Sequence, residues 1–167
     1  MATYQAIAAV SAAVRALLEH AVTSAVAGAE VRVVNSEGLH ARPADGVTIY
    51  LHRVTANTMV RGAPGRHGRA GLALDLHYLI TAWATDPIRQ QSLLGWALRV
   101  LEDTAVLTAH ALNEQAPGPD VFKADESVEL VLEPLSIQDD TAIWNAAGAR
   151  FETSASYIAR GVRIDSL

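Results

Sequence analysis

The chain has no cysteine. That absence excludes disulfide bonds, thiolate metal sites and a cysteine nucleophile, and it is compatible with a reducing compartment such as the cytoplasm. Lysine is almost as scarce, since Lys123 is the one lysine in the sequence, and there is no Gly-x-x-x-x-Gly-Lys phosphate-binding motif. The formal net charge of -5 gives no overall attraction to nucleic acid or anionic lipid.

A long uninterrupted apolar run is also lacking. The first 27 residues are rich in alanine and valine, but they lack a basic start, and Arg15, Glu19 and His20 interrupt them. This pattern fits neither a secretory signal nor a membrane span. We therefore expect a cytoplasmic protein that is carried elsewhere only as part of a larger assembly, without inserting into a membrane itself.

The sequence does contain enough apolar side chain for one core. Hydrophobic residues make up 50% of the 167 residues and charged residues 19%. A disordered chain would need lower hydrophobicity and higher net charge. No linker divides the sequence, so we predict one domain over residues 1–167.

Periodicity and turn residues predict an α+β fold. Steps of three and four between Ile7, Val10 and Val14 indicate a helix over residues 4–26. Asp86 and Ser136 are suited to cap two later helices, which run to about residues 103–104 and to residue 148. The predicted strands are Glu30–Asn35, Val47–Val54, Leu72–Ala84, Ser127–Glu133 and Ser154–Ile164, with a further helical turn at Thr108–Asn113. We expect a single mixed, mainly antiparallel sheet with helices packed against it.

The strand Leu72–Ala84 has two different faces. One face is apolar throughout, whereas the other begins polar at Asp75 and His77 and becomes apolar at Leu79. This change predicts that one end of the strand is covered on both sides. The tryptophans Trp83, Trp96 and Trp144 are expected in the core.

A metal site is the first chemical alternative. Asp75 and His77 lie two residues apart on one strand face, and His52 on the preceding strand could lie opposite them. Imidazole and carboxylate groups at that spacing can bind zinc or iron, which would favour a metal-dependent enzyme. The other interpretation is a hydrogen-bonded Asp–His pair on a half-covered sheet. There is no Gly-x-Ser-x-Gly elbow and no nucleophile beside a base, so we expect no enzyme and no cofactor.

A basic loop follows the second strand. Residues 55–70 contain Arg61, Arg66, His67 and Arg69 among several glycines. Three interpretations stay open: a solvated loop, a contact with acidic side chains of a protein partner, and a nucleic-acid contact, which is weakly supported because no aromatic residues are interleaved.

Five segments, taken in order, resemble one known family. They are Ile49–Asn57 (IYLHRVTAN), Leu72–Trp83 (LALDLHYLITAW), Leu94–Thr108 (LGWALRVLEDTAVLT), Leu132–Ser136 (LEPLS) and Ser156–Asp165 (SYIARGVRID). Together they resemble the cap proteins of extracellular contractile injection systems, over roughly residues 1–166. Gly161 departs from the expected bulky residue and predicts a bulge or a close backbone approach in the last strand.

The resemblance implies a fold similar to phage tail terminators and a structural role. Such a protein would end the inner tube away from the baseplate, contact the last sheath ring and form a ring with copies of itself, expected to be a homohexamer. A terminator or head–tail joining protein of a phage tail is the alternative. The partners implied are the tube and sheath proteins, with no small-molecule substrate and no nucleic acid.

Two surfaces are candidates for those contacts. Arg61, Arg66 and Arg69 could dock onto acidic tube or sheath surfaces. An open sheet edge could accept a strand from a sheath subunit by strand addition. We expect the last strand to be that edge, with the candidate residues Ser156, Ile158, Arg160 and Val162.

Overall fold

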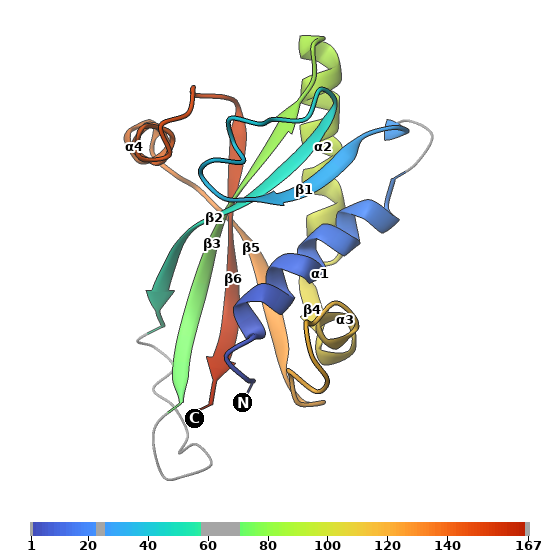
Figure 1. Ribbon diagram of the computed structural model, residues 1–167, viewed down its shortest axis with the longest axis vertical. Helices are drawn as coiled ribbons and strands as arrows, with labels where there is room; N and C mark the ends of the chain where they lie inside the picture. Colours follow the sequence, from blue (N-terminus) through green and yellow to red (C-terminus); the bar gives the residue numbers. More distant parts are fainter. Residues whose placement is uncertain (1, 23–25, 58–70, 166–167) are drawn as a thin grey trace.

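A computed structural model describes residues 2–22, 26–57 and 71–165, so Arg61, Arg66 and Arg69 lie outside the described residues. Within these ranges the chain forms one six-stranded sheet and four helices (Figure 1), which confirms the α+β fold class. In chain order the elements are α1 (Ala6–His20), β1 (Glu30–Val34), β2 (Gly46–Ala56), β3 (Leu72–Trp83), α2 (Pro87–Asp103), β4 (Val106–Thr108), α3 (Ala109–Glu114), β5 (Ser127–Glu133), α4 (Ile137–Ala146) and β6 (Ser154–Ile164).

The strand order is β1-β2-β3-β6-β5-β4. β1 runs parallel to β2, and every other neighbouring pair is antiparallel. The parallel pair requires the chain to return from the end of β1 to the start of β2, and residues 35–45 make that crossing. β2 and β3 form a long antiparallel hairpin. β2 ends at Ala56 and β3 begins at Leu72, on either side of the segment that connects them.

The main core lies on the sheet face covered by α1, α2 and α3. Alternate residues of β3, from Leu74 to Ala82, point into it. A hydrogen bond of 2.9 Å between the hydroxyls of Tyr78 on β3 and Ser11 on α1 ties this helix to the sheet. This bond gives the buried Tyr78 hydroxyl a partner. Without one, the loss of its hydrogen bonds to water would reduce the stability of the fold.

A second, smaller core lies on the opposite face. Leu79 and Trp83 of β3 pack there against Leu39 of the crossing segment and Trp144 of α4. The Trp83 and Trp144 rings meet edge to face with centroids 6.2 Å apart. Double coverage at this end of β3 confirms what the change from polar to apolar residues predicts.

Local signals place most element boundaries correctly. The Asp86 carboxylate accepts from the backbone N–H of Ile88 and Arg89 at the start of α2, and Ser136 accepts from Asp139 at the start of α4. α1 ends at His20, six residues short of the prediction, with Ala21 as its C-cap residue. The three-residue strand β4 was not predicted because it is too short to show a period.

The prediction that the last strand is a sheet edge is wrong. β6 lies between β3 and β5, and Ser156 and Ile158 pair with residues on both sides. Val162 is fully buried. The Arg160 side chain is exposed, and it lies beside its cross-strand neighbour Glu129 on the same face of the sheet. The bulge predicted at Gly161 is confirmed, since its φ is +90° and the β3–β6 register shifts beside it.

Candidate interaction surfaces

The metal hypothesis is not supported by the geometry. Asp75 accepts a hydrogen bond of 3.0 Å from the Asn57 amide. His77 is bound at both ring nitrogens, with Nε2 2.9 Å from Thr55 Oγ1 and Nδ1 3.1 Å from Glu133 Oε2. The partner of His77 is therefore Glu133 rather than Asp75. In the described parts of the chain, no three His, Asp or Glu side chains are arranged to hold a metal ion.

A cavity of about 530 Å³ lies between α4 and the sheet. Of the ten residues of α4 only Trp144 is fully buried, and the partly buried Ile143 packs beside it, so the helix contacts the sheet over a small area. The side chains of His52, Arg53, His77 and Glu133 line the sheet side of the cavity, and Asp139 lines the helix side. We call this space the α4 cavity.

His52 is the unusual group of the α4 cavity. Its pKa is lowered to about 4, first by burial and then by the neighbouring His77, whose ring centroid lies 6.1 Å away, and by Arg53, while Glu133 acts in the opposite direction. The imidazole is therefore neutral at pH 7. Its Nε2 atom is enclosed and has no hydrogen-bond partner.

The second candidate surface is the outer edge of β1. The N–H of Glu30 donates to Asp45 on the β2 side, so Glu30, Arg32 and Val34 direct their backbone groups toward β2. Because the direction alternates along a strand, the backbone groups of Val31 and Val33 point away from the sheet. No other strand lies beyond β1 in the residues that the structure covers, and the Val33 side chain is 42% exposed.

A family model, the Pvc16 N-terminal domain, matches residues 9–167. The chain belongs to this family. No curated protein matches it. In the comparison with solved structures, this Pvc16 N-terminal domain is similar to the sheath/tube terminator, in the extended state, of the extracellular contractile injection system PVC. That match has 18% identity and a TM-score of 0.61, and it covers 96% of this chain and 57% of the terminator.

A second solved structure has the same fold. It is the tube-terminating cap of the anti-feeding prophage, with 17% identity, a TM-score of 0.58, and coverage of 95% of this chain and 54% of the cap. The domain thus spans somewhat more than half the length of both structures. The expected terminator-like fold is confirmed, and so is the family that the sequence resembles.

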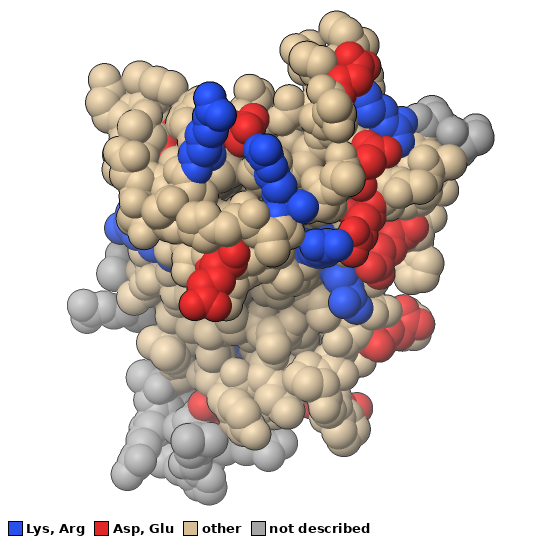
Figure 2. All heavy atoms as spheres, turned by 45° about the horizontal axis from the view of Figure 1, so that its top comes forward, with Lys and Arg blue, Asp and Glu red and all other residues tan. Residues whose placement is uncertain are grey.

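The charged surface of the domain is mixed. Figure 2 shows basic and acidic side chains lying next to one another, with no broad field of one sign on this face. Several of them are paired, as in Arg89 with Asp45 at 3.0 Å and Arg42 with Glu152 at 3.4 Å. Arg42 also lies over the Trp83 ring, 5.4 Å from its centroid. Among the residues described, no helix combines the length and apolar character needed to cross a bilayer.

Neither surface was found from the sequence. The β1 edge follows from the strand order, which no local pattern encodes. Glu133 is the last residue of β5 and lies on the face opposite the main core. No sequence signal showed that α4 would cover that end of the face, because Pro134 marks only where β5 stops.

Proposed function

We propose that this domain ends the inner tube of a contractile injection particle at the end away from the baseplate. The observation that carries the proposal is the fold, which is shared with two tube-terminating proteins over 95% or more of this chain. We further propose that six copies form the ring and that the ring contacts the last sheath ring. The six-fold number comes from the symmetry expected for such tubes and sheaths.

The arrangement of the sheet suits a closed ring. A ring requires a heterologous interface, in which two different patches of one subunit meet. β1 and β4 lie at opposite edges of the sheet, and they differ in length and in direction relative to their neighbours. Each subunit therefore has two chemically different edges available for different contacts.

Electron microscopy of particles made with and without this gene tests the proposal. We expect tubes of uncontrolled length, or sheaths already contracted, when the gene is absent, and normal particles when the wild-type gene is restored. Tubes of normal length with closed ends in the deletion strain would show that another protein ends the tube. Particles that instead carry a DNA-filled head would point to the phage-tail alternative.

We also propose that the outer edge of β1 accepts an extended segment from a sheath subunit. Val31 is buried, but Val33 is exposed and directs its N–H and C=O groups away from β2, and strand addition needs a free edge of this kind. Val33→Pro removes one outward donor without touching the bonds to β2, because proline is tolerated on the solvent side of an edge strand. We expect at least about tenfold weaker binding to capless particles in a cosedimentation assay. Val33→Thr, which keeps the N–H, is the matched control and should bind normally.

A separate contact is proposed for the arginine-rich segment between β2 and β3. Its arginines, Arg61, Arg66 and Arg69, carry charge suited to acidic partner surfaces. Replacing all three with glutamate should block capping while the subunit stays folded, as checked by circular dichroism. Particles of normal length made with this variant would exclude the contact.

A further inference from the structure

The α4 cavity is large enough to admit a side chain from a partner. Its volume of about 530 Å³ lies within the range of ligand-binding cavities. It lies beside the contact that Trp144 and the partly buried Ile143 make with the sheet, where most other residues of α4 are exposed. A second cavity of about 440 Å³ shares Glu133, Pro134 and Leu135 as walls and reaches Asp140 and Ser154.

Glu133 is held in the α4 cavity as a pre-oriented acceptor. Its Oε2 atom accepts from Ser156 Oγ at 3.0 Å and lies 3.1 Å from His77 Nδ1. Both contacts use the same oxygen, so Oε1 keeps its lone pairs for another donor. The side chain is 20% exposed, which leaves the carboxylate accessible from the cavity. A carboxylate fixed by two donors needs little reorganisation to bind a third.

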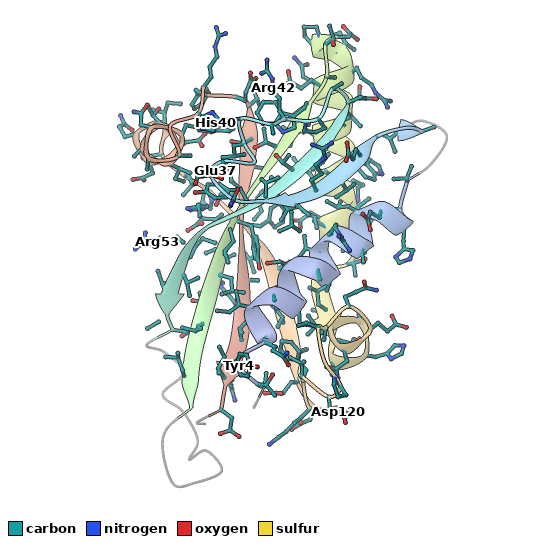
Figure 3. All side chains as sticks on the ribbon, in the orientation of Figure 1. Tyr4, Glu37, His40, Arg42, Arg53 and Asp120 are labelled. Carbon is teal, nitrogen blue, oxygen red and sulfur yellow. The ribbon has the colours of Figure 1, made fainter. Side chains whose placement is uncertain are left out.

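The remaining groups on the walls favour a cation over an anion. Asp139 adds a second carboxylate on the α4 side, where its Oδ2 accepts from Ser136. Arg53 is the basic side chain on the walls, and in Figure 3 it extends away from the sheet. His52 adds no positive charge at pH 7, because burial lowers its pKa, and its enclosed Nε2 atom has no partner. The walls therefore carry two carboxylates and one guanidinium, so the net charge near the cavity repels an anion and attracts a cation.

We propose that the α4 cavity binds the guanidinium group of an arginine side chain from a partner protein, with the Glu133 carboxylate as its acceptor. Guanidinium suits such a site because its planar donors can reach a carboxylate and a neighbouring acceptor at the same time. That the partner is a subunit of the same particle rests on the proposed function. Binding of guanidinium in the cavity does not.

Nuclear magnetic resonance of the isolated, 15N-labelled protein tests the site with N-acetyl-arginine amide as the probe. We expect saturable shifts of the backbone amides of His52, Glu133 and Ala142, which line the cavity. N-acetyl-citrulline amide has nearly the same shape without the charge, and it should bind at least about fivefold more weakly. Equal binding of the two probes, or shifts confined to other surfaces, would overturn the proposal.

Glu133→Gln isolates the role of the carboxylate. Glutamine keeps an oxygen that can accept from Ser156, so the fold should survive while the arginine probe binds at least about fivefold more weakly. Glu129→Gln is the matched control, because Glu129 lies on the same strand and face but stands opposite Arg160 in the β5–β6 register, outside the cavity. If Glu133→Gln does not fold, Asp139→Asn at the rim replaces it and should weaken the probe by about twofold. Unchanged affinity in the variant used would refute the assignment, whatever the tube-length experiment shows.

Discussion

The partly buried imidazole of His52 predicts that acid destabilises the protein in a defined pH window. The pKa of His52 is about 4 in the folded protein, against an ordinary value of 6.5. Between these two pH values the unfolded chain binds a proton at His52 more readily than the folded chain does. The free energy of unfolding therefore falls as the pH falls from about 6.5 toward 4.

The magnitude follows from the difference between the two pKa values. Linkage at one such site reduces the free energy of unfolding by about 2 kcal/mol between pH 7 and pH 5. The His52 ring is only partly buried, so water screens its charge and we expect about 1 kcal/mol. The groups facing it are His77 on β3, Glu133 on β5 and Arg53 on its own strand.

Urea unfolding at pH 7 and pH 5 measures this contribution. Wild-type protein should lose about 1 kcal/mol more between the two pH values than His52→Gln, which cannot gain a proton there. His110→Gln is the matched control, because the His110 side chain is 85% exposed, and it should behave as the wild type does. An equal loss in wild type and His52→Gln would show that His52 titrates normally and that the enclosed geometry does not control it.

Four further substitutions test the fold by urea unfolding. Gly46→Ala places a Cβ atom 2.1 Å from the Glu30 carbonyl oxygen and should lower the free energy of unfolding by about 2 kcal/mol or more. Gly95→Ala on α2 places a Cβ atom with nothing within 4 Å and should raise the free energy of unfolding by up to about 1 kcal/mol. A neutral Gly46→Ala would contradict the β1–β2 approach. Trp144→Ala should cost about 3–5 kcal/mol, and a loss under about 1 kcal/mol would show that α4 is not anchored there. Asp86→Ala removes the α2 cap and should cost about 1 kcal/mol, and no change would exclude the cap.

Elements with strong local chemistry were predictable from the sequence. Asp86 and the proline after it mark the start of α2, and the alternation in β5 gives its bounds, because capping and pleating act over a few residues. The double coverage of β3 could also be predicted, since Leu79 and Trp83 have no reason to be apolar on a solvated face.

Pairing between distant strands was not predictable. Ser156, Ile158 and Arg160 share one face of β6, and this mixture of polar and apolar side chains is typical of a half-exposed edge strand. It is instead a central strand whose one face is only partly covered, and this follows from β5 returning beside it. Alternation of polar and apolar residues indicates which face of a strand is exposed to solvent. It does not indicate how many neighbouring strands pair with that strand.

The two proposed contacts can be separated by combining their variants. β2, β3 and β6 lie between β1 and β5, which places Val33 roughly 19 Å from the strand that carries Glu133. At that separation the effects of Val33→Pro and Glu133→Gln on binding free energy should add if the edge and the cavity engage different segments of the partner. Binding of the single and double variants to capless particles measures the sum. A double variant no weaker than either single one would mean that both surfaces hold the same segment, so that losing one contact already abolishes the other.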